Sequence, residues 1–328
     1  LYSFNLLPFG GFVKLYGEDE DATDSDAYNN ISHNPRSFIS KSAKAKVAII
    51  TAGVLMNFAL AMVTYFVLFL FTGFKSMHLP AFFDYTFRFG EPQYTRTVIA
   101  GFAENSPAEV AGIQLGEAIV KVGDISVSNI EEVRTAVASK VNQSVPVEVK
   151  DLRDPTNSKT RIASVIPTSD AEGNGILGVY LSSSTQISYA NKLLAPFLHS
   201  YNMLAYTGST LGKFVNLSFA TKSVEPISAT VSGPVGIYSV VDIILSFGGK
   251  GAFLGLLDFI ALMSLTLAFI NILPLPALDG GRLAFIVLEA IIGKKLHPSI
   301  EANVHKWGMI FFFGILILIS VKDVLQFF

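Results

Sequence analysis

Long apolar runs alternate with polar stretches along the chain, and three of these runs are long enough to cross a bilayer as helices. Residues 47–74 carry no charged side chain and exceed the roughly 20 residues that a crossing helix needs. The second run, residues 252–281, is interrupted by Asp258 near its start, and residues 306–328 form the third. The pattern predicts a multi-pass α-helical membrane protein.

Residues 189–251 are apolar in part but do not form a fourth continuous run. Apolar and polar positions mix at helical spacing over 189–217, and Pro234 and Asp242 interrupt the apolar stretch that follows. We expect amphipathic or re-entrant helices here, lying along the outer membrane surface. A connector helix that faces solvent is the alternative for the first part.

Basic residues gather at two boundaries between the runs, and they predict the orientation of the chain. They are Lys41, Lys44 and Lys46 before the first run, and Arg282, Lys294, Lys295 and Lys306 between the second and the third. Because Lys and Arg near span ends accumulate on the cytoplasmic side, residues 1–46 and 282–305 are expected inside the cell. An odd number of spans then places the polar region 75–188 outside.

The region 75–188 has the rhythm of a small α+β domain. Short β-branched runs, glycine turns and one amphipathic stretch predict strands at 98–102, 118–122 and 145–150, a helical turn at 107–111, a tight turn at 123–124 and a helix at 130–139. We place the boundaries of this domain at about residues 95–182.

The run "SPAEVAGIQLGEAIVKVGDISV" inside this domain resembles the PDZ domains of bacterial proteases. It departs from their pattern where Glu117-Ala118 replaces the Asp that precedes Ile. The resemblance implies a groove that binds a peptide as an added strand, so a peptide is a candidate partner. A folded spacer that only blocks access is the alternative.

Composition narrows the class of protein further. About half of the residues (51%) are hydrophobic and only 15% are charged, which is the composition of a protein whose main partner is the lipid bilayer. The net charge of −2 provides no basic surface for nucleic acid. The chain has no cysteine, so a metal site must use His, Asp or Glu.

The stretch "NILPLPALDGGR", residues 271–282, is the strongest candidate for chemistry. Pro274 and Pro276 cannot continue a helical hydrogen-bond ladder, and Gly280 and Gly281 allow a sharp turn. Broken backbone at membrane depth is tolerated where protein or a water-filled cavity satisfies it, which implies a cavity. Asp279 is then a functional candidate, and its carboxylate beside two imidazoles would suit zinc. The alternative is that Asp279 only caps the helix that follows.

The longer run "FINILPLPALDGGRLAFIVLEAI" resembles the second metal-ligand motif of the site-2 protease family, which are intramembrane zinc metalloproteases. The resemblance implies that Asp279 is the third protein ligand of the zinc ion. It also implies that Asn271 positions the substrate or stabilises the reacting carbonyl.

Three further stretches resemble the same family, in chain order. "NLLPFGGFVKLYGE" is similar to the family's cytoplasmic, membrane-associated β-hairpin loop, which implies substrate contacts from Phe9, Gly10, Gly11, Phe12 and Val13. "AGVLMNFALA" carries Asn57 at the family's Asn, although Val54 replaces a Pro. "VSGPVGI" carries the family's Gly-Pro-x-Gly element at Gly233, Pro234 and Gly236.

The family's first metal motif, His-Glu-x-x-His, does not occur in this sequence. The five histidines are His33, His78, His199, His297 and His305, and we expect surface or interfacial positions for them. In the family that motif lies on the helix just before the hairpin loop, and the sequence begins with Leu inside that loop. We therefore expect an N-terminal truncation before or within that helix. Two of three zinc ligands and the Glu base would then be missing, and the chain alone would be inactive.

The resemblance implies an enzyme of the bacterial regulator-of-sigma-E protease type, placed in the cytoplasmic (inner) membrane with its PDZ-like domain outside. Its expected activity is regulated intramembrane proteolysis of single-span membrane proteins such as anti-sigma factors and signal-peptide remnants. A non-catalytic membrane adaptor with a PDZ-like domain is the alternative. A transporter also breaks helices around an intramembrane Asp, but no inverted repeat is visible in the sequence.

Overall fold

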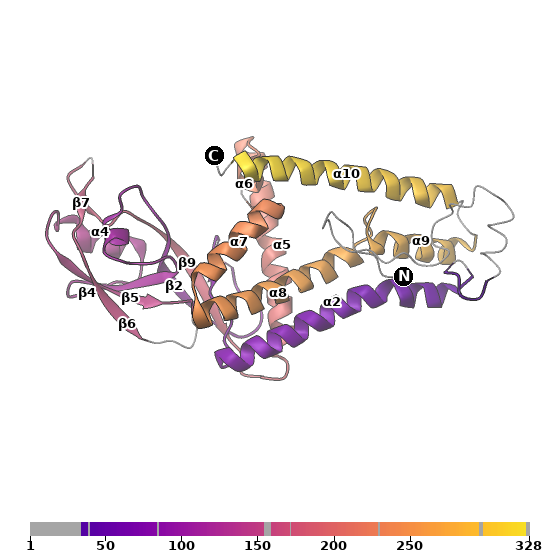
Figure 1. Cartoon of the computed structure of the whole chain (residues 1–328), viewed down its shortest axis with the longest axis horizontal. Coiled ribbons are helices and arrows are strands. Elements are labelled where there is room, and N and C mark those ends of the chain that lie inside the picture. Colours follow the sequence, from indigo (N-terminus) through magenta and orange to yellow (C-terminus); the bar gives the residue numbers. More distant parts are fainter. Residues whose placement is uncertain are drawn as a thin grey trace. The chain divides into compact units, whose positions relative to one another are not determined.

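The structure is a computed structural model that describes residues 34–325 except 39, 84, 154–158, 171, 229 and 295–297. The predicted β-hairpin loop, with its candidate substrate residues 9–13, lies outside the described residues. The helices are α2 (Ala43–Thr72), α3 (Pro107–Val110), α4 (Ile130–Ala138), α5 (Ala195–Thr221), α6 (Glu225–Ser228), α7 (Pro234–Ser246), α8 (Gly249–Ile272), α9 (Asp279–Ile292) and α10 (Pro298–Leu325) (Figure 1). The strands are β1 (Leu79–Pro80), β2 (Glu91–Phe102), β3 (Glu117–Val122), β4 (Ile125–Ser126), β5 (Val145–Asp151), β6 (Thr160–Val165), β7 (Thr168–Ser169), β8 (Gly175–Ile176) and β9 (Val179–Ser188).

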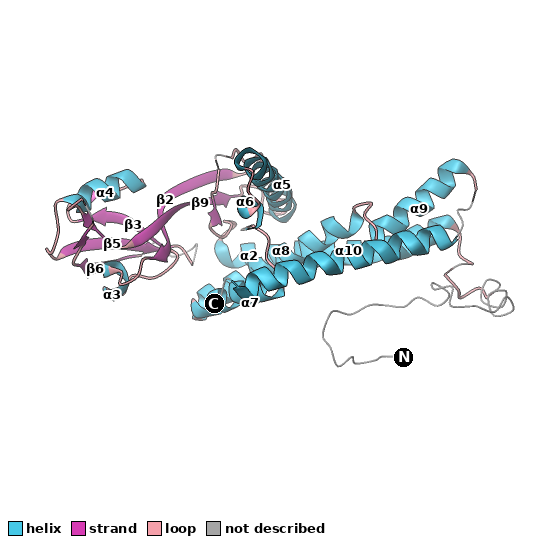
Figure 2. Cartoon of the chain, turned by 90° about the horizontal axis from the view of Figure 1, so that it is seen from above, coloured by secondary structure: helices cyan, strands magenta, loops and turns pink. Residues whose placement is uncertain are grey.

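The chain divides into two compact units. The first holds residues 1–56 and 268–311, and the second holds residues 57–267 and 312–328. All the strands, coloured magenta in Figure 2, therefore belong to the second unit, whereas α9 belongs to the first.

Three helices in the described part of the chain are long and apolar enough to cross a membrane, namely α2, α8 and most of α10. They coincide with the three predicted runs. Their ends differ from the prediction, because α10 already begins at Pro298 and α8 ends at Ile272, before the predicted residue 281. The segment 282–305 consequently consists largely of α9 and the first turns of α10. The apolar helix α7 has 13 residues, fewer than a crossing helix needs.

Antiparallel pairing organises the second unit. Among the described residues, seven strands form one sheet in the order β1-β9-β2-β3-β5-β6 with β4 attached to β3, and β7 pairs with β8. The predicted strands at 98–102, 118–122 and 145–150 and the helix at 130–139 are confirmed as parts of β2, β3, β5 and α4. The two longest strands, β2 and β9, extend the sheet beyond the predicted limits of residues 95 and 182.

The strands and the helices α3 and α4 form a sheet domain between residues 79 and 188. Its core follows from the alternation of buried and exposed positions along the strands. Val145, Val147 and Val149 of β5 point to one face and are buried, while the residues between them are more exposed. On α4, Val133 and Val137 lie four residues apart and join the same buried cluster. Burial of these side chains stabilises the sheet against the helix.

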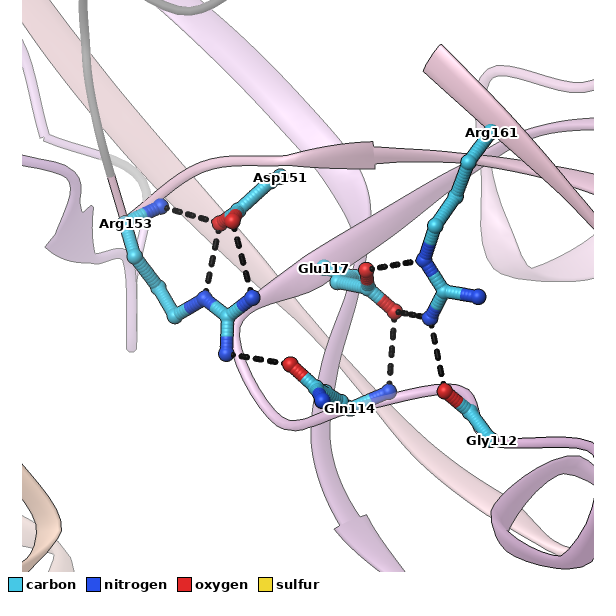
Figure 3. A network of polar contacts seen from close by, with 6 residues as sticks. All are labelled: Gly112, Gln114, Glu117, Asp151, Arg153 and Arg161. Atoms are coloured by element: carbon cyan, nitrogen blue, oxygen red, sulfur yellow. Dashed lines mark hydrogen bonds and ion pairs between the residues drawn. The ribbon is translucent and has the colours of Figure 1, made fainter. Parts of the chain in front are cut away.

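The residue that departs from the PDZ pattern, Glu117, is the centre of a polar network (Figure 3). Its side chain is buried and accepts hydrogen bonds from the backbone N–H of Gln114 (2.8 Å) and from Nε and Nη2 of Arg161 (2.9 and 2.7 Å). Arg161 Nη2 also donates to the carbonyl of Gly112, and Arg153 donates to the Gln114 side chain. The buried carboxylate is thus paired, and it ties the loop before β3 to β6.

A second core joins the end of β9 to α2 and α5. Tyr65 and Phe69 of α2 pack edge-on against the ring of His199, which is fully buried. The Tyr189 hydroxyl lies 2.9 Å from His199 Nδ1, and Asn202 Nδ2 donates to the same hydroxyl at 3.2 Å. Burial lowers the pKa of His199 to about 3. The expectation of a surface or interfacial histidine is therefore wrong for His199, because aromatic rings enclose it.

Candidate metal centre

The candidate centre is built where α8 ends and α9 begins. The helix α8 stops at Ile272, and turn hydrogen bonds continue the chain to Asp279, from Leu275 N–H to the carbonyl of Leu273 (2.7 Å) and from Leu278 N–H to the carbonyl of Leu275 (3.3 Å). Figure 1 shows α8 and α9 as separate helices joined by this loop. The predicted break at the two prolines is present, and Asp279 is the first residue of a new helix.

Two glycines follow Asp279 because the loop folds tightly against the first turn of α9. A Cβ atom on Gly280 would collide with the backbone carbonyls of Leu273 and Ile272, and one on Gly281 would collide with the carbonyl of Leu275. Both glycines are buried. The Gly-Gly pair is therefore needed for the close approach of two backbone segments, in addition to the sharp turn that the sequence predicts.

The carboxylate of Asp279 has no polar partner among the described residues. Leu278 is the N-cap of α9, and no side chain caps the helix. Asp279 is exposed and accepts no hydrogen bond from any described group. The alternative that Asp279 serves as the helix cap is wrong, because the residue lies one position too late and its oxygens contact no backbone N–H of α9.

Gly53, in the first half of α2, lies next to this carboxylate. A Cβ atom built on Gly53 would lie 4.0 Å from Asp279 Oδ2, so the absence of a side chain leaves space beside the oxygen. Asn271 is in the last turn of α8 and Asn57 is on α2, and both are half-buried. Neither amide has a hydrogen-bond partner in the described part of the chain. The structure does not place Asn57 relative to Asp279, because the two residues belong to different units.

The donor chemistry of Asp279 fits one ligand of a zinc ion. Zinc accepts carboxylate oxygen together with imidazole nitrogen, and Asp279 offers an oxygen whose lone pairs are free. Within the described residues, however, no group of three or more His, Cys, Asp or Glu side chains could hold a metal. The described part of the chain thus fits a single protein ligand of such a site.

The loop before Asp279 contacts α10 of the same unit. Ala277 has a left-handed backbone (φ 69°), and its N–H donates to His305 Nδ1 at 3.0 Å. Gly308 lies against Pro276, where a Cβ atom would collide with the proline ring. Sequence reasoning missed these two α10 residues. A histidine in an apolar helix is a sequence signal for a functional position, but the third predicted run begins at residue 306, one residue after His305.

The Gly-Pro-x-Gly element is explained by a contact that the sequence did not predict. The carboxylate of Asp323, near the end of α10, accepts hydrogen bonds from the N–H groups of Gly233 (2.7 Å) and Gly236 (3.1 Å) at the start of α7. Lys322 Nζ lies 3.1 Å from the same carboxylate and donates to the carbonyls of Ser228 and Val231. Asp323 therefore caps α7 from another helix.

A groove between α4 and the start of β9 is the candidate peptide site of the sheet domain. It has a volume of about 410 Å³, and Arg134 is the charged residue in its otherwise mostly apolar lining. The N–H groups of Leu177 and Gly178 at its edge donate no hydrogen bond within the described residues. Gly178 has φ 70°, which a side chain would strain.

These features define a protein with three apolar candidate spans, an inserted sheet domain and an unpaired carboxylate on a broken helix. The sequence model of peptidase family M50 matches residues 1–315. The chain therefore belongs to peptidase family M50, the site-2 protease family of membrane-embedded zinc metalloproteases.

Individual relatives agree with the family model. The zinc metalloprotease RasP of Shouchella clausii is 30% identical over 293 residues, which cover 89% of this chain and 62% of that protein. RasP of Oceanobacillus iheyensis is 28% identical over 334 residues, which cover 99% of this chain and 68% of the relative. Among solved structures, the PDZ domain of an SdrC-like protein from Listeria monocytogenes matches with a TM-score of 0.23 and 20% identity, over 27% of this chain and 90% of that domain.

Proposed function

We propose that the protein is an intramembrane zinc endopeptidase of the regulator-of-sigma-E protease type, which cuts single-span membrane proteins. The observation that carries the proposal is the carboxylate of Asp279, which lies on a broken helix of an apolar chain without a polar partner among the described residues. An ionisable group in such a position is rarely retained for the fold alone. Membership of a family of zinc metalloproteases supports zinc as its ligand.

In this proposal Asp279 holds the zinc ion together with two imidazoles of a His-Glu-x-x-His helix, a motif that this sequence does not contain. Bound zinc supplies an activated water for hydrolysis of a peptide bond. The half-buried amide of Asn271 binds the carbonyl of the substrate peptide and orients it. Gly53 keeps the space beside Asp279 open, since any side chain there would approach the carboxylate.

The substrate must be unwound before it is cut, because the peptide bonds of a transmembrane helix are already hydrogen-bonded along the segment. We propose that residues 9–13 receive the unwound segment as an added strand. This role rests on the resemblance of "PFGGFVK" to the family's hairpin loop, since these residues lie outside the described part.

The sheet domain would act on the outer side of the cytoplasmic membrane. We place it there from the distribution of basic residues, with α5 and α7 along the membrane surface. There the domain would admit only substrates whose outer part has been trimmed, such as anti-sigma factors and signal-peptide remnants. The groove beside α4 would take a peptide end, with its carboxylate at the free N–H groups of Leu177 and Gly178.

Cleavage of a reporter tests the enzyme against its rival, a non-catalytic adaptor. The protein is expressed from its natural reading frame with a single-span substrate that has a short outer tail. We expect the wild type to cut within the span, and we expect Asp279→Asn to abolish cutting at an unchanged protein level. The control Asp242→Asn alters an exposed acid of α7 and should cut normally. A wild type that binds the substrate without cutting it would support the adaptor.

A further inference from the structure

We infer that His305 of α10 is a positioning residue that holds the loop before Asp279 in the conformation that presents the carboxylate. The inference rests on the proposed function, in which Asp279 binds zinc. His305 belongs to neither of the family's metal motifs. The observation that carries the inference is the hydrogen bond from the Ala277 N–H to His305 Nδ1.

The loop needs an external support because its backbone is strained. Ala277 has φ 69°, a left-handed conformation that is unfavourable for an L-residue because its Cβ approaches the following carbonyl oxygen. Its N–H donates to His305 Nδ1 at 3.0 Å, so the side chain from α10 satisfies a backbone donor that the turn leaves free. The hydrogen bond therefore favours the strained conformation over a relaxed one.

The geometry also defines the proton on His305. A nitrogen that accepts a hydrogen bond carries no proton, so in neutral His305 the proton is on Nε2. Nε2 is buried and has no partner among the described residues. Nδ1 of the imidazole therefore accepts a hydrogen bond from the loop, and Nε2 is not exposed to bind a metal ion.

Further contacts hold the loop and α10 together around this hydrogen bond. Gly308 lies one turn after His305 on the same face of α10 and permits close contact with Pro276. A Cβ atom on Gly281 would lie 3.2 Å from His305 Cε1, and the ring of Phe285 lies 5.9 Å from the imidazole. The residues before and after Asp279 are therefore both in contact with α10.

A specific consequence follows for Asp279, which is two residues after Ala277. If Ala277 relaxed to a right-handed conformation, the chain direction at Leu278 would change and the carboxylate would move. Loss of the acceptor should weaken metal retention without unfolding α9 or α10. Groups that orient a metal ligand typically change metal affinity by about 10- to 100-fold when they are removed.

The experiment compares zinc release from His305→Leu and His305→Asn in the protein expressed from its natural reading frame and purified in detergent. The zinc-loaded protein is mixed with an excess of chelator, and the release rate is followed. We expect release to be about tenfold faster or more in His305→Leu. His305→Asn retains an acceptor near the position of Nδ1 and should release zinc within about threefold of the wild-type rate. Asn303→Leu, an exposed change on the same helix, is the control.

A second substitution separates this role from simple packing. Ala277→Gly adopts the left-handed conformation without strain, so adding it to His305→Leu should recover most of the lost retention. A cavity left by the missing imidazole would not be repaired in this way. If His305→Leu alone is poorly folded, the rate of zinc release from the double variant still tests the positioning role.

The failures of the two proposals are distinguishable. If Asp279→Ala loses zinc while His305→Leu releases it at the wild-type rate, the positioning role is wrong and the proposed function stands. If His305→Leu and His305→Asn release zinc equally fast and Ala277→Gly restores nothing, the hydrogen-bond account is overturned. If Asp279→Ala retains zinc, the proposed function itself fails.

Discussion

The carboxylates of Glu117 and Asp279 differ in their hydrogen-bond partners. Glu117 is buried and accepts hydrogen bonds from Arg161 and from the backbone of Gln114. Asp279 has no polar partner among the described residues. A paired, buried acid supports the fold, whereas an unpaired one beside an open glycine position is available to a ligand. Only the second residue is thus a candidate for chemistry.

The paired acid leads to a prediction about stability. Replacing Arg161 with Ala leaves the Glu117 carboxylate buried with a single backbone donor, and we expect a loss of about 2 kcal/mol in the free energy of unfolding. This figure is below the usual cost of breaking a buried ion pair, because the Arg161 side chain is 44% exposed. Chemical denaturation of the sheet domain measures it. The double variant Glu117→Gln, Arg161→Ala should be more stable than Arg161→Ala, and equal stabilities would contradict the pairing.

The buried His199 leads to a prediction about pH. Burial lowers the pKa of His199 to about 3 and that of His78 to about 4, both below the ordinary value of 6.5. Below about pH 6.5 the unfolded chain therefore binds protons that the folded chain does not, and stability falls as the pH drops toward these values.

Each such histidine should contribute a slope of up to about 1.4 kcal/mol per pH unit. Thermal unfolding in detergent between pH 7.5 and pH 5 measures this effect. We expect His199→Leu to flatten the decline and to leave the contribution of His78. An unchanged decline in His199→Leu would show that the imidazole is not buried neutral.

At the scale of elements, the sequence predicts the local secondary structure but does not predict the contacts between elements that are distant in the chain. The three apolar helices and the strands β2, β3 and β5 follow from the hydrophobic period, and the break between α8 and α9 follows from Pro274 and Pro276. The contacts between these elements cannot be predicted from the same patterns. Nothing in the pattern around Gly233 or Ala277 reveals that Asp323 and His305 contact them, because these residues are 90 and 28 positions away.

The contact between α7 and α10 gives a prediction at this scale. Asp323→Leu removes the acceptor of the Gly233 and Gly236 N–H groups, and we expect it to destabilise the second unit by about 2 kcal/mol. Thermal unfolding in detergent measures the change. Gly236→Ala should have a similar effect, because its Cβ would lie 2.7 Å from the Ser232 Cβ. Asp242→Asn is the matched control on α7. If it loses as much stability as Asp323→Leu, the role of Asp323 as a helix cap is contradicted.

For the whole molecule, the sidedness of the membrane arrangement is testable because the sequence has no cysteine. Single cysteines are introduced at Val110, which is 86% exposed in the sheet domain, and at Lys294, which is exposed after α9. We expect a membrane-impermeant maleimide to label Val110→Cys from outside in spheroplasts, and Lys294→Cys only after lysis. The reverse pattern would contradict the orientation predicted from the basic residues.

The central claim is that the oxygen of Asp279 binds zinc, and X-ray absorption at the zinc edge of Asp279→Cys tests it most directly. Residues 1–328 contain no cysteine, so among them a cysteine sulfur neighbour would come only from the substituted position. In the protein expressed from its natural reading frame, we predict a zinc–sulfur distance of about 2.3 Å in Asp279→Cys and none in the control Asp242→Cys. Full zinc occupancy without a sulfur neighbour in Asp279→Cys would contradict the account.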